Sequence, residues 1–80
     1  MRIRMKDGRV FQGTGLQIVR AMQDIAFGVD AFTVPEYIEW VANNVRNFEA
    51  VELDITGLTD QDKAESLVQG MLRAGLAQRA

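Results

Sequence analysis

The 80-residue sequence contains no cysteine and no histidine. Without cysteine, the chain can form neither a disulfide framework nor a thiolate metal site. Without histidine, it lacks the commonest general base, the commonest metal ligand and the usual pH switch near neutrality. We therefore expect the protein not to be an enzyme, and we predict no catalytic residue, no cofactor and no metal site.

Long apolar runs are also missing. No stretch approaches the roughly 18 to 20 apolar residues that a membrane span requires. Residues 1–9 carry charges with no apolar run behind them, so they do not have the pattern of a signal peptide. Because 48% of the residues are hydrophobic and only one is proline, we expect one folded globular domain over residues 1–80. A cytoplasmic location without a membrane partner is the expectation that follows.

The clearest helix signal lies in residues 33–48. Thr33 and Glu36 have the spacing of a capping box, and Pro35 falls in the first turn, where its missing N–H costs nothing. Apolar residues then recur at steps of three and four: Val34, Tyr37, Ile38, Val41, Val45 and Phe48. The pattern predicts an amphipathic helix that packs one face on the core.

Two further helices are predicted over residues 14–28 and 59–75. Each begins at a threonine suited to cap the first turn, and each ends at a glycine suited to a helix C-cap. Gly75 is followed by Leu76, which stands where such a cap makes its apolar contact. The remaining residues, 77–80, are expected to form a frayed tail.

Three stretches alternate apolar and charged residues with period two, which is typical of strands with one buried face. They are residues 2–6, residues 9–13 and residues 50–55. The first two are joined through Asp7 and Gly8, and Asp-Gly between two such runs is a strong signal for a β-hairpin.

The charges on these stretches suggest how the strands pair. Arg2 and Arg4 of the first strand are expected to face water. Glu52 and Asp54 of the third strand are expected to do the same. Opposite charges on neighbouring strands favour their pairing by about a few tenths of a kcal/mol. We therefore predict a two-layer α+β domain with the order β-β-α-α-β-α, its helices on one face of a three-stranded sheet with strand order 2-1-3.

Trp40, the only tryptophan, falls roughly 120° away from the centre of the apolar face of the helix over residues 33–48. Either another element covers its ring, or the ring contacts a partner, since tryptophan is enriched among interface anchors. The candidate interaction surface consists of Trp40, Glu36, Asn44 and Asn47. The leading hypothesis is that the chain is a small protein-interaction or self-associating module. It would bind either a second copy of itself, as a homodimer, or another protein.

The alternative hypothesis is a nucleic-acid-binding accessory protein. The N-terminal hairpin carries a candidate basic patch that consists of Arg2, Arg4, Lys6 and Arg9. Basic β-ribbons can follow phosphates or enter a groove of a duplex. Against this hypothesis stand the formal net charge of −2 and the expected pairing of the hairpin arginines with the acids of the third strand.

Overall fold

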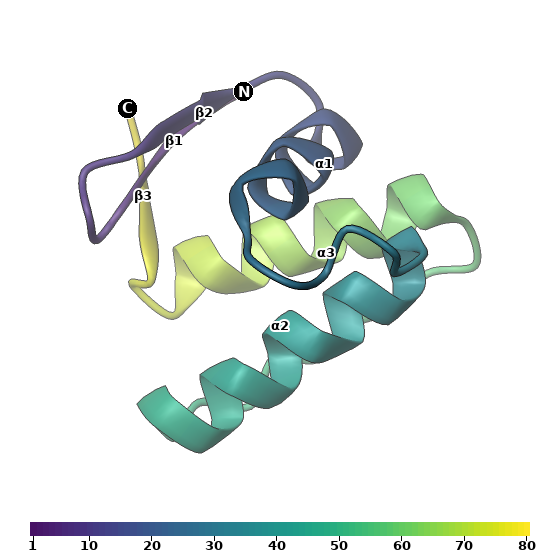
Figure 1. Ribbon diagram of the computed structural model, residues 1–80. Coiled ribbons are helices and arrows are strands. Elements are labelled where there is room, and N and C mark those ends of the chain that lie inside the picture. Colours follow the sequence, from purple (N-terminus) through teal and green to yellow (C-terminus); the bar gives the residue numbers. More distant parts are fainter.

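The computed structural model describes all 80 residues and places three helices on one side of a small sheet (Figure 1). The strands are β1 (Arg2–Met5), β2 (Val10–Gln12) and β3 (Ala77–Arg79). The helices are α1 (Gly15–Ile25), α2 (Val34–Glu49) and α3 (Asp60–Arg73). The predicted α+β class and the predicted strand order are confirmed, because the antiparallel sheet has the order β2-β1-β3. None of the three helices has the length and apolar character needed to cross a membrane.

The third strand is not the one predicted. Residues 51–56, here called the acidic segment, lie outside the sheet, so the strand predicted over residues 50–55 is wrong. The position next to β1 is occupied by β3, which comes from the stretch that we expected to fray. The Ala80 N–H donates to the carbonyl oxygen of Arg2 across 3.0 Å and holds the end of the chain against β1. The observed order of elements is therefore β-β-α-α-α-β.

The turn at the end of α3 explains why the tail joins the sheet. Gly75 has a φ of 77°, a left-handed conformation that glycine adopts without steric cost. The N–H groups of Gly75 and Leu76 donate to the carbonyl oxygens of Leu72 and Met71, at 3.2 and 2.9 Å. This is the predicted glycine cap, and Leu76 is buried as expected. The cap reverses the chain, so that Ala77 comes to lie opposite Met5 of β1.

The acidic segment instead packs along α3. The Ser66 hydroxyl accepts from the Thr56 N–H at 3.0 Å and donates to the Asp54 carbonyl oxygen at 3.2 Å. Leu53 and Ile55 are half-buried against the core, as the alternating pattern predicted. The alternating pattern thus identified the inward side chains correctly. The backbone of the acidic segment, however, is hydrogen-bonded to the Ser66 side chain of α3 and not to a neighbouring strand.

The predicted starts of all three helices are confirmed. Thr14 and Thr33 form complete capping boxes, and the Thr59 side chain accepts the backbone N–H of Asp62. At its other end α1 stops at Ile25, earlier than the glycine at position 28 suggested.

The core lies between the inner face of the sheet and the three helices. Its fully buried side chains include Ile3 of β1, Ile18 of α1 and Leu67 of α3. Gln23 is the one buried polar side chain, and its amide donates to two carbonyl oxygens of the α1–α2 connection, at 2.8 and 2.9 Å. A buried amide that is satisfied in this way fixes the path of the connection. The start of α2 is thereby positioned relative to α1.

Candidate interaction surfaces

The structure brings together the four residues of the predicted interaction surface. All four lie on α2 at successive steps of four, four and three residues, so they form one stripe along the helix: Glu36, Trp40, Asn44 and Asn47. We call this set the α2 stripe.

Two members of the α2 stripe are engaged by α2 itself. A Glu36 carboxylate oxygen accepts the Thr33 N–H at 2.8 Å. This hydrogen bond to the Thr33 backbone, and to a smaller extent one to the Thr33 side chain, hold the pKa of the Glu36 carboxyl below its usual value. The Asn44 side-chain amide donates to the Trp40 carbonyl oxygen at 3.0 Å. The Trp40 ring and the Asn47 amide are therefore the members whose side chains remain free to contact a partner.

The Trp40 ring is partly covered and partly exposed, so neither alternative from the sequence describes it fully. Its side chain is 39% exposed, and its ring stacks on that of Tyr37 with 5.8 Å between centroids. Tyr37 is buried, and this burial raises the pKa of its hydroxyl to about 12. Because the Tyr37 ring is buried, it is a fixed support for Trp40.

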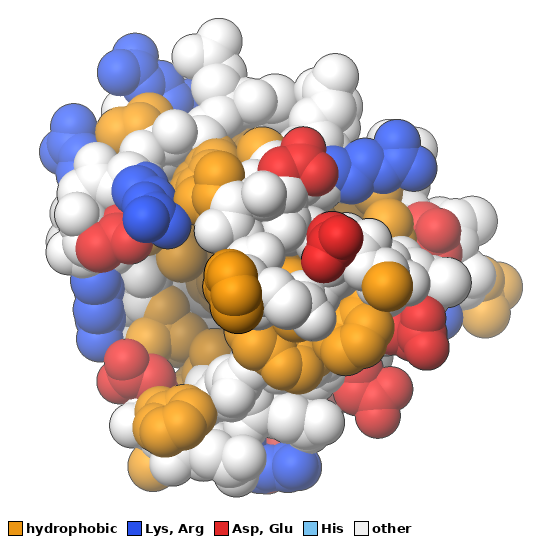
Figure 2. Space-filling view, viewed as in Figure 1, with side chains coloured by type: hydrophobic (Ala, Val, Ile, Leu, Met, Phe, Trp, Pro, Cys, Tyr) orange, Lys and Arg blue, Asp and Glu red, His pale blue; other side chains and the backbone are white.

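Further apolar side chains are exposed on the connection that leads from α1 into α2. Figure 2 shows hydrophobic side chains over the α1–α2 connection and along α2. Those that are exposed around the connection are Ile25, Phe27 and Phe32. We call these three residues and Trp40 the apolar face. Ile25 also lines the same hollow as Tyr37, the residue on which Trp40 stacks.

The predicted basic patch is divided between two faces of the hairpin. Arg2 and Arg4 flank the buried Ile3 and lie on the outer face of the sheet, away from the helices. Arg9 lies on the inner side, where it lines a hollow together with Phe11. Figure 2 shows Lys and Arg side chains along the edge of the molecule that the hairpin and β3 form.

The internal partners expected for the hairpin arginines are absent. Arg2 and Arg4 form no ion pair, and the acids predicted to face them belong to the acidic segment, outside the sheet. The residue opposite Arg4 on β3 is Gln78. The predicted pairing of Arg2 and Arg4 with Glu52 and Asp54 is therefore wrong, because β3 takes the position next to β1.

A groove that the sequence did not reveal separates the hairpin from α1 and α2. Two hollows of about 180 and 280 Å³ share Met5, Asp7 and Met22, and together they form this apolar groove. Three of the four methionines of the chain line it. Its apolar lining includes Met5, Met22, Met71, Phe11, Tyr37 and Val41.

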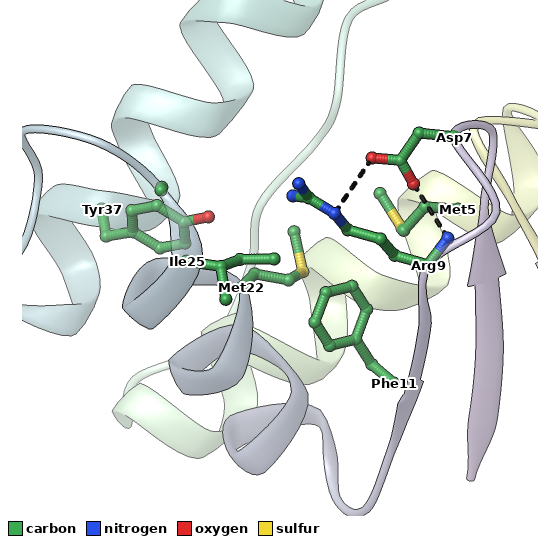
Figure 3. A pocket seen from close by; sticks show the side chains of 8 residues that line it. Met5, Asp7, Arg9, Phe11, Met22, Ile25 and Tyr37 are labelled. Atoms are coloured by element: carbon green, nitrogen blue, oxygen red, sulfur yellow. Dashed lines mark hydrogen bonds and ion pairs between the residues drawn. The ribbon is translucent and has the colours of Figure 1, made fainter.

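Charged pairs stand at the rim of the apolar groove. Figure 3 shows Phe11 and Met5 on the hairpin side, Tyr37 on the opposite side, and the Arg9 side chain beside Asp7. Arg9 Nε lies 3.6 Å from a carboxylate oxygen of Asp7. Farther along, Lys6 Nζ lies 3.7 Å from a Glu49 carboxylate oxygen and links the hairpin turn to the end of α2. The groove is thus apolar on its floor and polar at its edge.

The arrangement offers contact area rather than reactive groups. Methionine side chains adapt their shape to an apolar partner, and the charged groups at the rim already have partners. No set of three carboxylates lies close enough together to hold a metal ion. No spacing rule could have revealed the groove, because its walls come from five elements that are distant in sequence.

Comparison with known proteins finds no family model, no curated protein and no solved structure that matches this chain. The features of this chain that bear on its function are therefore the α2 stripe, the apolar face, the apolar groove and the outer face of the sheet.

Proposed function

We propose that this protein is a small non-enzymatic interaction module that self-associates as a homodimer through a surface centred on Trp40. A cytoplasmic location is part of the same proposal.

The observation that carries the proposal is the exposed but supported ring of Trp40. A tryptophan that is held by a buried neighbour has little conformational freedom to lose when a partner covers it. The stacking on Tyr37 supplies that support, and the 39% exposed fraction leaves ring area for a contact. Tryptophan and tyrosine are also the residues most often found at the energetic centre of interfaces.

The proposed surface extends from Trp40 to the α1–α2 connection. The apolar face adds exposed side chains from the α1–α2 connection, including Phe27, which is fully exposed. Exposed apolar side chains that gather into one patch are typical of interaction sites. In a homodimer with two-fold symmetry, one such surface covers its own copy, so a single patch is sufficient.

Sedimentation equilibrium over a wide concentration range tests the proposal. We expect the wild-type chain to dimerise, and we expect Trp40→Ala to raise the dissociation constant by about 30-fold, the effect of losing a 2 kcal/mol anchor. Phe48→Ala is the matched control, because Phe48 is an 82% exposed aromatic residue at the far end of the same helix. Circular dichroism should show that both variants keep the helical content of the wild type.

Two outcomes would contradict self-association through Trp40. One is a wild-type chain that remains monomeric at millimolar concentration. The other is a dimer that Phe48→Ala weakens as much as Trp40→Ala does.

A second candidate function, nucleic-acid binding, is favoured by one specific observation. Arg2 and Arg4 lie on the outer face of the sheet without an ion-pair partner, and the side chains beside them include Gln12 and Gln78. Cations that no internal carboxylate neutralises are free to contact phosphates. The expected internal pairing was one of the arguments against this function, and that pairing is not present.

Salt-dependent binding to a short DNA duplex distinguishes the second candidate. The logarithm of the association constant should fall linearly with the logarithm of the salt concentration, and Arg2→Gln should reduce the slope by about one. Arg20→Gln, on α1, removes the same charge outside the hairpin and should leave the slope unchanged. No binding at low salt would exclude this function.

A further inference from the structure

A separate hollow lies between the β1–β2 turn and the turn that joins α3 to β3. Its volume is about 320 Å³. Its lining residues include the polar residues Arg4, Lys6 and Gln78, together with Gly8 and Gly75 of the two turns. No atom lies within 4 Å of the position that a Cβ would take at either glycine, so both turns leave room for a close approach.

This hollow differs from the others in its charge. Arg4 and Lys6 are its charged lining residues, and no carboxylate lines it. Every other hollow on the molecule contains at least one Asp or Glu in its lining. On a chain of formal net charge −2, a concave site of this kind is a local region of positive potential that attracts anions.

Neither cation of the hollow is firmly held by an internal partner. Arg4 forms no ion pair. Lys6 lies 3.7 Å from Glu49, with side chains 60% and 44% exposed, and such solvent-exposed pairs are weak. Asp7, which follows Lys6 in the turn, directs its carboxylate to the N–H and side chain of Arg9 on the groove side. An anion in the hollow therefore meets one cation without an ion-pair partner, Arg4, and a second, Lys6, whose pair with Glu49 is weak and solvent-exposed.

We propose that the hollow lined by Arg4, Lys6 and Gln78 binds a phosphate group. A guanidinium can donate two parallel hydrogen bonds to phosphate oxygens, and an ammonium adds a point charge to the same group. The Gln78 amide supplies a neutral donor from the opposite strand. The phosphate belongs either to a small free anion or ester or to a nucleic-acid backbone, and the two sources share this chemistry. The inference does not depend on self-association, because no α2 residue lines the hollow.

Amide chemical shifts in ¹H–¹⁵N spectra test the site in two arms at constant ionic strength, with inorganic phosphate in one and a short single-stranded oligonucleotide in the other. We expect saturable shifts at the amides of Lys6, Gly8 and Gln78. Arg4→Gln should weaken binding at least about tenfold, since it removes a charge-assisted contact. Lys6→Gln should weaken it by a smaller factor, and Arg20→Gln is the control of equal charge change on α1.

The two arms identify the source of the phosphate. Equal affinities in the two arms indicate a small phosphate ligand, whereas a much tighter oligonucleotide complex with shifts extending to Arg2 indicates a nucleic-acid backbone. Either result supports the site. The absence of saturable shifts in both arms would overturn it, as would equal losses of affinity in Arg4→Gln and Arg20→Gln. Self-association is measured separately by sedimentation, so its failure is distinguishable from the failure of this site.

Discussion

The acidic segment and β3 are both extended stretches that lie against α3, but their backbones are satisfied in different ways. β3 pairs with β1 as part of an antiparallel ladder. The acidic segment has no backbone–backbone hydrogen bond, and only the Ser66 hydroxyl binds its main chain, at Asp54 and Thr56. Two stretches with similar conformation can therefore differ greatly in how firmly they are held.

The difference arises from how the chain enters each stretch. Gly75 caps α3 with a left-handed residue and directs the next residues antiparallel to β1. At the end of α2 the left-handed residue is Ala50, and the chain that follows crosses to the start of α3 without reaching the sheet (Figure 1). Because β2 and β3 occupy both sides of β1, no position beside β1 remains for the acidic segment.

The largest effect is expected from breaking the anchor of β3. Leu76→Ala should lower the free energy of unfolding by about 3 kcal/mol, since the side chain is buried and its loss leaves a cavity. Urea denaturation gives the value, and Leu58→Ala is the control, because Leu58 is fully exposed in the loop before α3. A loss below about 1 kcal/mol, comparable with the control, would mean that β3 is not anchored through this residue.

This contrast shows which parts of the fold a single sequence can specify. The helix starts depend on residues within one turn of each other, such as Thr33 and Glu36, and they were predicted correctly. The glycine cap at Gly75 was also predicted, since it depends on adjacent residues. The partner of β1 depends on where two distant stretches arrive, and the weakly strand-like Ala77–Arg79 gives no local sign of it.

The functional surfaces follow the same rule. The α2 stripe was predicted because helical spacing alone places its residues together. The stacking of Trp40 on Tyr37 was not predicted, although the three-residue spacing permits it. The apolar groove forms where the hairpin meets α2, and the hollow lined by Arg4, Lys6 and Gln78 forms where the hairpin meets the α3–β3 turn. No local sequence pattern specifies either meeting.

The second prediction compares Gly70, which lies within α3, with Gly75, which lies in the cap at the end of α3. Gly75→Ala should lower the free energy of unfolding by about 1 to 2 kcal/mol, because alanine is strained at a φ of 77° although its methyl group has space. Gly70→Ala is the opposite case: the added carbon would lie 3.4 Å from Leu53, an ordinary contact, and alanine favours the helix by about 1 kcal/mol. Thermal unfolding should therefore show a lower melting temperature for Gly75→Ala and an unchanged or higher one for Gly70→Ala.

Equal destabilisation by the two substitutions would contradict the distinction between the sites. It would indicate that the Leu53 side chain cannot move away from a methyl group added at Gly70. The acidic segment would then be packed more tightly on α3 than the contact distance implies.

The third prediction concerns the weaker attachment of the acidic segment. Ser66→Ala removes both hydrogen bonds to the segment and should lower the free energy of unfolding by about 1 kcal/mol or less, because water can reach the freed groups. Hydrogen exchange should accelerate at the Thr56 amide while the amides of β3 keep their protection. Ser66→Thr retains a hydroxyl and serves as the control. Faster exchange in β3 as well would show that the two stretches unfold together.

The smallest effect is expected for the coupling between the charges of β1 and those of the acidic segment, whose opposite signs had favoured pairing of the two stretches. A double-mutant cycle of Arg4→Ala and Asp54→Ala should give a coupling energy below about 0.5 kcal/mol, because residues on separate elements without shared partners act independently. The pair Lys6 and Glu49, 3.7 Å apart, is the positive control and should couple by about 0.2 to 1 kcal/mol. A larger coupling for Arg4 and Asp54 than for the control would place the acidic segment beside β1 in solution. A coupling near zero leaves the positive charge of Arg4 without an internal partner, as binding of a phosphate group in the hollow that it lines requires.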